Sequence, residues 1–241
     1  MTISSALTAL NTDIQNARTA ITNKGGTVTS GGGSSQLAAD IATIPSGGGS
    51  GKYQLLQRIS NDNGNEIGTV SGFFTDANDV EYAVVCLDAQ YRLAQGTYCS
   101  NTNNSITNLP MYQDQTLFSS SETSTFNTQK ILDFCASNSA TSTSCTHCRS
   151  KSFTIGGTTY YGQLPNIAEL IDIFRRRVEV NLADTSSSSY SSLVIPTASR
   201  TWSSTQYAGG YSWVVNKYGV QYNTKSQNSL VIPVLEIPNA V

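Results

Sequence analysis

The sequence predicts an α+β protein in which a helical amino-terminal segment precedes a larger domain. Apolar residues recur at helical spacing near the start of the chain, and glycine- and serine-rich stretches follow. After Lys52 come three strand-like runs, two helical stretches and further strands, an order typical of α+β domains. We therefore divide the 241 residues into an amino-terminal segment, 1–51, and a head, 52–241.

The amino-terminal segment begins with a predicted helix that ends at Lys24-Gly25-Gly26. Its apolar residues follow one another in steps of four and three, the a/d pattern of a coiled-coil seam. These residues are Ile3, Leu7, Leu10, Ile14, Ala17 and Ile21. About three heptads make a marginal helix in isolation, so we expect this helix to anchor the chain to identical copies or to a docking partner. An amphipathic helix that packs on its own domain is the alternative.

Two glycine- and serine-rich stretches, 31–35 and 46–51, surround a short helical candidate. That candidate, 36–44, is closed by Pro45. Runs of Gly and Ser behave as flexible linkers. The chain is therefore expected to consist of an anchor, a tether, a short second anchor, a second tether and the head.

The head is predicted to start with a small β region, 52–124, and to continue with a core region, 125–241. The strand candidates of the first region are 53–59, 67–74 and 80–87. The core region opens with two helices, one capped by Asn127 and one beginning at Leu164-Pro165-Asn166. Strands and long loops are expected to complete it.

The end of the core region is predicted to be a set of strands. Trp213 and Val215 are expected to share one face of a strand, and Tyr218-Gly219 to form a turn. The apolar run 230–235 predicts a buried closing strand.

The stretch from Trp202 to Asn228 combines aromatic residues with Ser, Gly, Gln and Asn. Antibody paratopes have this composition, because rigid rings supply contact area at a low entropic cost and small polar groups supply hydrogen bonds. Core packing is the alternative for the rings, and we expect Trp202 and Trp213 to be buried. The predicted ligand-binding residues are Tyr207, Tyr211, Tyr218, Tyr222, Asn223, Lys225 and Asn228.

Several motifs between residues 125 and 238 occur in a characteristic order. The chain contains Gln163-Leu164-Pro165-Asn166-Ile167-Ala168-Glu169-Leu170, then Trp202-Ser203-Ser204-Thr205 and Ser212-Trp213-Val214-Val215-Asn216, then Gly219 and Val231-Ile232-Pro233-Val234. This combination resembles the C-type-lectin-like domains of phage and bacterial surface proteins, a group that includes variable proteins diversified by retroelements. The resemblance implies a C-type-lectin-like head.

The start of the chain also resembles a known class. Asn23-Lys24-Gly25-Gly26 at the end of the heptad helix, and Ala38-Ala39-Asp40-Ile41-Ala42-Thr43-Ile44-Pro45 after it, are similar to amino-terminal segments of phage tail and fibre proteins. Such segments attach the protein to the virion. By analogy with fibre proteins, three chains are expected to share the anchor.

The charge and hydropathy of the chain argue against two classes of partner. Charged residues make up 12% and the formal net charge is -2, so a nucleic-acid ligand is not expected. Arg175-Arg176-Arg177, at a predicted helix end, suits the helix dipole better than a phosphate site. No apolar run approaches the roughly 20 residues of a transmembrane helix, and Met1–Ser5 does not resemble a secretory signal. Release by lysis or assembly into a particle is therefore the expected route out of a cell.

The cysteine and histidine content predicts neither a disulfide framework nor a metal centre. The chain has five cysteines and one histidine, and we expect mostly buried thiols. Cys145-Thr146-His147-Cys148 has the spacing of half a zinc site, but tetrahedral zinc requires a second pair of ligands. A thiol pair or a local disulfide is the preferred interpretation, and no metal or other cofactor is expected.

No catalytic residue is predicted. A nucleophilic triad would have to use His147, which lies in a loop without a nucleophile elbow. Glu169 is the acidic candidate for glycoside hydrolysis, but its place inside a predicted helix favours a structural hydrogen bond or a solvent-facing charge. Between Ser186 and Leu235 the chain contains no Asp or Glu, so the calcium-dependent sugar site of animal lectins is not expected. The formylglycine-generating enzymes share the lectin-like fold, but their arginine- and glycine-rich signature is not found here.

The sequence thus predicts a non-enzymatic virion protein that is exposed on a tail or head fibre. Its amino-terminal helix would contact phage structural proteins, and its head would bind a glycan or protein on the host cell. The alternatives are a structural head-fibre or decoration protein and a glycan hydrolase that uses carboxylates of the head.

Overall fold

The computed structural model describes residues 3–23, 28, 40, 52–76, 78–102, 105, 106, 109, 122–186, 195 and 199–239. The chain divides into two compact units, one that ends at Gln54 and one that spans Leu55–Asn239. The predicted tethers, 31–35 and 46–51, lie outside the described residues, as does the helical candidate 36–44 except for position 40.

The first unit contains the helix α1 (Ile3–Asn23), so the predicted amino-terminal helix is confirmed. Within its seam Ile21 is only 3% exposed, and Ile14 and Ala17 are half-buried. The side chains of Ile3, Leu7 and Leu10 are outside the described residues. The carboxyl-terminal end of the seam is thus covered within this chain, and association of the helix with other chains stays a prediction. Among the described helices, none is both long and apolar enough to span a membrane.

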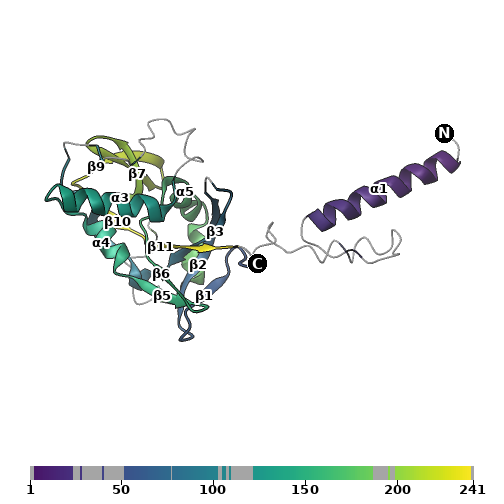
Figure 1. Ribbon diagram of the computed structural model, residues 1–241, viewed down its shortest axis with the longest axis horizontal. Coiled ribbons are helices and arrows are strands. Elements are labelled where there is room, and N and C mark those ends of the chain that lie inside the picture. The colour runs from purple at the N-terminus through teal and green to yellow at the C-terminus, as the bar shows by residue number, and fades with distance from the viewer. Residues whose placement is uncertain are drawn as a thin grey trace. The chain divides into compact units, whose positions relative to one another are not determined.

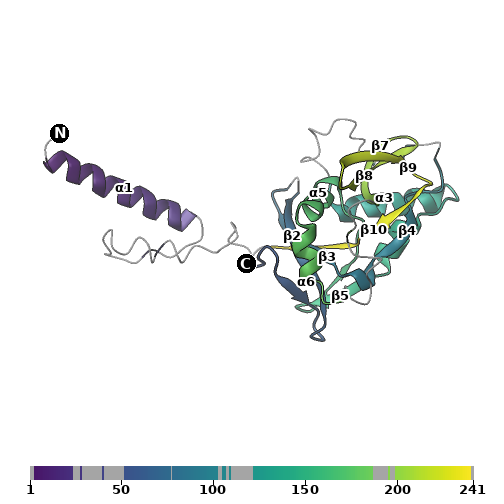
Figure 2. The same cartoon turned by 180° about the vertical axis from the view of Figure 1, so that it is seen from behind.

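The second unit is a mixed α+β domain with two larger sheets and a hairpin (Figures 1 and 2). The four-stranded sheet is antiparallel throughout, and its order is β1 (Arg58–Ser60), β2 (Glu66–Thr75), β3 (Glu81–Leu87) and β11 (Val234–Pro238). The order in the five-stranded sheet is β4 (Leu93–Thr97), β10 (Asn228–Val231), β7 (Thr201–Ala208), β8 (Tyr211–Asn216) and β9 (Gly219–Thr224), and only β10 and β7 are parallel. The hairpin consists of β5 (Ser152–Ile155) and β6 (Thr158–Tyr161).

The helices cover the two sheets. Their bounds are η2 (Ala89–Tyr91, a 3-10 turn), α3 (Ser124–Ser137), α4 (Thr143–Arg149), α5 (Ile167–Arg175) and α6 (Arg177–Ala183). The helix α5 contacts β2 of the four-stranded sheet and β7 and β8 of the five-stranded sheet. The helices α3 and α4 contact each other and the strands β7 and β4 of the five-stranded sheet. The five-stranded sheet is therefore covered by helices of both groups.

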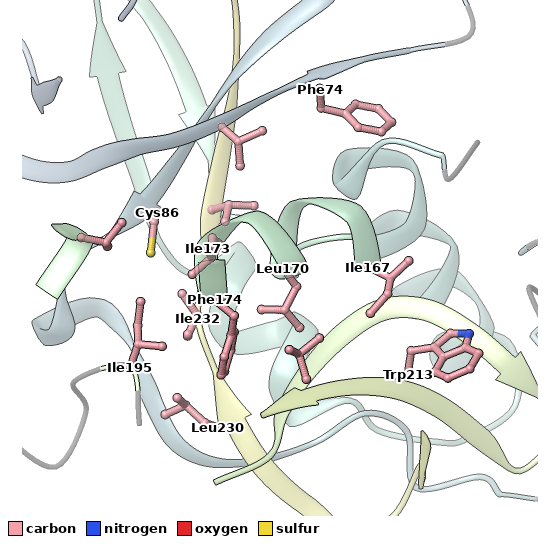
Figure 3. Close-up of a cluster of buried hydrophobic side chains, with 14 residues drawn as sticks. Phe74, Cys86, Ile167, Leu170, Ile173, Phe174, Ile195, Trp213, Leu230 and Ile232 are labelled. Carbon is pink, nitrogen blue, oxygen red and sulfur yellow. The ribbon is translucent and has the colours of Figure 1, made fainter. Parts of the chain in front are cut away.

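Two apolar cores result from this arrangement. The first surrounds α5, whose Ile167 lies on the side of Trp213 of β8 and whose Phe174 points toward Leu230 of β10 (Figure 3). The second lies under α3 and α4 and includes Trp202. Trp202 is fully buried and Trp213 is 4% exposed, so the prediction that both tryptophans are buried is confirmed.

The helix α5 begins where the sequence predicts. The Asn166 side chain accepts a hydrogen bond from the Glu169 backbone N–H at 2.9 Å, and the Glu169 carboxylate accepts one from the Asn166 N–H at 2.9 Å. This capping box satisfies two backbone donors that a helix start leaves without partners. Arg175 ends the helix, and both Arg175 and Arg176 pair with Asp172. The arginine run thus lies at a helix end, as predicted.

Three local predictions are wrong. The helix α3 is capped by Thr123, whose hydroxyl accepts from the Phe126 N–H at 3.1 Å, whereas Asn127 is buried inside the helix and donates to the Ser204 hydroxyl at 3.2 Å. The strand candidate 53–59 shrinks to β1, because a turn precedes Arg58. The closing run 230–235 is divided between β10 and β11, in different sheets, because Pro233 lacks the N–H that would continue one ladder.

Candidate functional site

Three tyrosines gather over Trp213 at one end of the strands β7, β8 and β9. We call Tyr207, Tyr211, Tyr222 and Trp213 the tyrosine cluster. The rings of Tyr207 and Tyr222 stack in parallel with centroids 4.5 Å apart, and Tyr211 meets Tyr222 edge to face at 5.5 Å. Trp213 meets Tyr207 edge to face at 4.9 Å. These are favourable geometries, each worth about 0.5–1.5 kcal/mol beyond the apolar area that it buries.

The strand register explains why these rings meet. Trp213 lies directly opposite Tyr222 in the β8–β9 ladder, so both side chains project from the same face of the sheet. Tyr211 is two residues from Trp213 and shares that face because side chains alternate along a strand. The β7–β8 register shifts between Gln206 and Ala208, and Tyr207 there packs against the first core.

The cluster is both supported and accessible. Tyr211 is 42% exposed and Tyr222 is 52% exposed, whereas Tyr207 is half-buried and rests on the core around α5. Rings that are already held by packing lose little further freedom when a ligand covers them. The cluster therefore has the physical properties of a preorganised contact surface.

The structure places Tyr218 and Asn228 in a second location. Tyr218 is 74% exposed in the turn between β8 and β9 and lines a pocket of about 560 Å³. Asn228, at the start of β10, lines the same pocket. Along β8, Asn216 of this pocket lies five residues after Tyr211 and three after Trp213, which is roughly 17 Å and 10 Å at about 3.3 Å per residue. Five of the seven predicted binding residues thus form two surfaces.

The prediction that Lys225 binds a ligand is wrong, because its side chain is fully buried. The Lys225 ammonium donates to the Gln206 side-chain oxygen at 2.6 Å and to the Gly209 carbonyl at 2.5 Å. Burial lowers its pKa to about 8. Lys225 therefore fixes the β7–β8 turn from inside. Asn223 is half-buried, and its side chain accepts from the N–H of Thr224 at 3.0 Å.

The acidic candidate Glu169 belongs to a buried carboxyl pair with Glu236 of β11. The two residues are 3% and 7% exposed. Burial, and then the charge of Glu236, raise the pKa of Glu169 well above its usual range. The Glu169 carboxyl accepts from the Ser124 hydroxyl, and Glu236 accepts from the Ser124 N–H at 2.7 Å and the Thr125 N–H at 2.9 Å. The pair holds the starts of α3 and α5, which is the structural role that the sequence favoured for Glu169.

The five cysteines are free and buried, in agreement with the expectation of mostly buried thiols. The sulfur atoms of Cys99 and Cys135 are 3.7 Å apart, and a hydrogen bond from Cys135 lowers the pKa of the Cys99 thiol to about 7. Cys145 and Cys148 lie on α4 in the second core. Nowhere in the described part of the chain do three His, Cys, Asp or Glu side chains form a group that could hold a metal ion.

His147, the single histidine, has a structural contact. Its ring Nε2 lies 2.7 Å from the carbonyl oxygen of Tyr91, and burial lowers its pKa. No hydroxyl or thiol nucleophile is bonded to this ring in the described residues. The imidazole therefore helps to hold η2 against α4.

Sequence reasoning missed Arg200 and Gln221, both of which line the pocket. Arg200 precedes β7, and Gln221 belongs to β9. One signal was available, since Arg200 is the only arginine in a long stretch without acidic residues. Which polar side chains it would meet depends on the order of strands in the sheet, which the sequence does not reveal.

Comparison of the chain with protein-family models, with curated proteins and with solved structures found no match.

Proposed function

We propose that this chain is a bacteriophage virion protein that attaches to a molecule on the host surface through its carboxyl-terminal domain. The observation that carries the proposal is the tyrosine cluster, in which two exposed rings, Tyr211 and Tyr222, rest on buried aromatic support. Tyrosines presented in this way are typical of recognition surfaces rather than of active sites. Host glycans and host proteins are the ligands that we assign to the domain.

The organisation of the chain supports the same proposal. The recognition surface lies in the second compact unit, and the amino-terminal helix lies in the first. Two glycine- and serine-rich stretches occur between them in the sequence. We assign the helix to attachment to the particle and to a homotrimer. Several heads on one particle would raise a weak affinity per head through multivalency.

The α+β arrangement of the second unit also supports the C-type-lectin-like resemblance. The motif Leu164–Leu170 contributes the start of α5, and Trp202–Thr205 belongs to β7 beneath it. The Thr205 hydroxyl accepts from the Ile167 N–H at 3.0 Å, so the two motifs contact each other directly. We therefore assign the domain to the C-type-lectin-like class.

Two properties favour attachment over hydrolysis. The acid pair Glu169 and Glu236 is buried, and its carboxyl oxygens are used to hold helix starts. A retaining or inverting glycosidase needs two carboxyl groups that reach a substrate. The pocket that Tyr218 and Asn228 line, in contrast, has no acidic side chain among its described lining residues.

The test is binding of the full-length protein to bacterial host cells, measured by flow cytometry with a fluorescent label. We expect Tyr211→Ser combined with Tyr222→Ser to abolish binding. Tyr161→Ser is the matched control, because Tyr161 is 51% exposed on β6, outside the cluster. Loss of binding in both variants, or in neither, would contradict the proposal. A protein that decorates particles but never binds cells would instead identify a structural fibre component.

A further inference from the structure

The pocket at the other end of the five-stranded sheet has the chemistry of a binding site of its own. It lies where β8 ends and β9 turns back, beside β4 and β10. Its volume of about 560 Å³ falls within the range of roughly 300–1,000 Å³ that is usual for small-molecule sites.

Among the described residues that line the pocket, Arg200 has the single charged side chain. Its side chain is exposed and forms no ion pair or hydrogen bond with any residue in the described part of the chain. Its backbone carbonyl accepts from the Leu230 N–H at 2.9 Å, which fixes the residue beside β10. The surrounding sequence from Ser186 to Leu235 contains no acidic residue that could neutralise it. A guanidinium with free donors binds a carboxylate in a bidentate geometry.

The rest of the lining consists mainly of groups that both donate and accept hydrogen bonds. They include the amides of Gln95, Asn216 and Gln221 and the hydroxyl of Ser229. Ser229 is 5% exposed, and within the described structure its hydroxyl has no partner. Because a buried hydroxyl without a partner costs free energy, Ser229 marks a place where a ligand hydroxyl would be favoured.

Tyr218 supplies the apolar element. Its ring is 74% exposed at the rim of the pocket, and the ammonium of Lys217 lies 4.9 Å from the ring centroid. The N–H of Tyr218 donates to the Asn216 side chain at 2.9 Å, which fixes the turn that presents the ring. An exposed aromatic ring can cover the C–H face of a sugar while the amides contact its hydroxyl groups.

We propose that this pocket binds an acidic saccharide, with the carboxylate of a uronic-acid residue at Arg200 and the sugar face against Tyr218. A peptide with a terminal carboxylate is disfavoured, because its side chains would require apolar lining. Among the described residues, only Ala94 and Leu230 provide it besides the ring of Tyr218 at the rim. This inference rests on the proposed function and names the chemical class of host ligand. The tyrosine cluster would then contact the more distant part of the same glycan or its carrier.

The experiment is saturation-transfer NMR of the full-length protein with oligogalacturonate, and with oligosaccharides of neutral galactose as the comparison. We expect the acidic probe to bind at least roughly tenfold more tightly than the neutral one, because a charge-assisted hydrogen bond is lost with the neutral sugar. Arg200→Gln should remove this preference, and Tyr218→Ala should weaken binding of both sugars. Lys151→Gln, which changes a cation between α4 and β5 rather than one beside the pocket, is the control.

Equal binding of acidic and neutral probes, or binding that survives Arg200→Gln unchanged, would overturn the inference. A peptide with a free terminal carboxylate that competes as well as the uronate would also overturn it. The cell-binding assay separates this failure from failure of the proposed function. If cells are bound through Tyr211 and Tyr222 but the uronate has no effect, the attachment function stands and only the assigned sugar is wrong. If uronate binding depends on Arg200 but cells are not bound, the pocket assignment stands and the proposed function is wrong.

Discussion

The two larger sheets differ in whether their strands contain charged residues. Each strand of the four-stranded sheet contains one charged residue, namely Arg58, Glu66, Glu81 or Glu236. No strand of the five-stranded sheet contains any. In the five-stranded sheet polarity comes from hydroxyls and amides, as when the Ser212 side chain donates to the Thr205 carbonyl at 2.7 Å.

The charges around the four-stranded sheet are used within the fold. Arg58 forms two hydrogen bonds to the Asp88 carboxylate, at 2.7 and 2.6 Å. Arg92 lies between β3 of this sheet and β4 of the other; its side chain donates to the Leu87 carbonyl at 3.0 Å and lies 3.6 Å from Asp184 in the interior. Arg200, next to the five-stranded sheet, has no such partner among the described residues. The comparison teaches that the strands of one sheet contain charges that are paired within the fold, whereas the exposed charge of Arg200 beside the other sheet is left unpaired by the described residues.

The largest expected effect compares two arginines. Arg92→Ala should lower the free energy of unfolding by about 3–5 kcal/mol, because the buried carboxylate of Asp184 loses its counter-charge. Arg200→Ala should change it by less than about 0.5 kcal/mol. Urea unfolding of both variants measures the difference, and similar losses for the two would break the comparison between the sheets.

The next effect concerns Lys225, the buried cation beneath the five-stranded sheet. Its pKa is about 8 in the folded chain and 10.5 ordinarily, so between these values the folded chain binds fewer protons than the unfolded chain. The stability contribution of Lys225 therefore rises with pH across this window, by about 1–3 kcal/mol. Lys225→Met should lack that rise. Unfolding free energies at pH 8 and pH 10 test it, and parallel pH profiles for the two proteins would show that the ammonium is not desolvated.

The contribution of Glu169 to stability should have the opposite pH dependence. Burial raises its pKa in the folded chain, so the folded chain binds more protons than the unfolded chain. The contribution of Glu169 to the free energy of unfolding is complete below its unfolded pKa of about 4.3. This contribution is lost as the pH rises through the folded pKa, and the free energy of unfolding falls by no more than about 1.4 kcal/mol per pH unit. Glu169→Gln should remove this loss and be more stable than the wild type at pH 8.

Glu236→Gln is the matched control for the acid pair. It removes the negative charge that faces the Ser124 and Thr125 N–H groups at the start of α3, so it should be destabilising at neutral pH. Thermal unfolding across pH 4 to 8 distinguishes the two carboxyls. Identical pH profiles for the two variants would contradict the assignment of the proton to Glu169.

The smallest expected effect separates recognition from stability. Tyr222→Ser removes one stacked contact and two edge-to-face contacts of a half-exposed ring, and should cost about 1 kcal/mol. Tyr161→Ser should change the free energy of unfolding by less than about 0.5 kcal/mol. Chemical denaturation measures both. A loss of several kcal/mol at Tyr222 would mean that this ring is part of the core rather than of a contact surface.

The sequence predicted the elements whose signal is local. The amino-terminal helix follows from a spacing of three and four, and the start of α5 follows from Asn166 and Glu169, which lie three residues apart. The burial of Trp202 and Trp213 follows from their size and their apolar neighbours. The exposure of Tyr211, one of the predicted contact residues, agrees with the Gly and Ser around it.

Contacts between distant segments could not be read in this way. Thr123 replaced Asn127 as the cap of α3 because Asn127 is drawn inward to Ser204, 77 residues further along the chain. The sequence predicts a surface position for Lys225, but in the structure its ammonium donates to two oxygens at the β7–β8 turn, those of Gln206 and Gly209. In both cases a tertiary hydrogen bond outweighs the local preference.

By itself the sequence determined the α+β class, the helical start and the aromatic character of the carboxyl-terminal stretch, because composition and periodicity encode these directly. Only the tertiary structure decided that this stretch makes two surfaces. Strand pairing brings Tyr207, Tyr211 and Tyr222 together over Trp213, and it carries Tyr218 to the opposite end beside Arg200. The physical reason is that a ladder fixes which residues face each other across strands, and that register depends on partners far away in the chain.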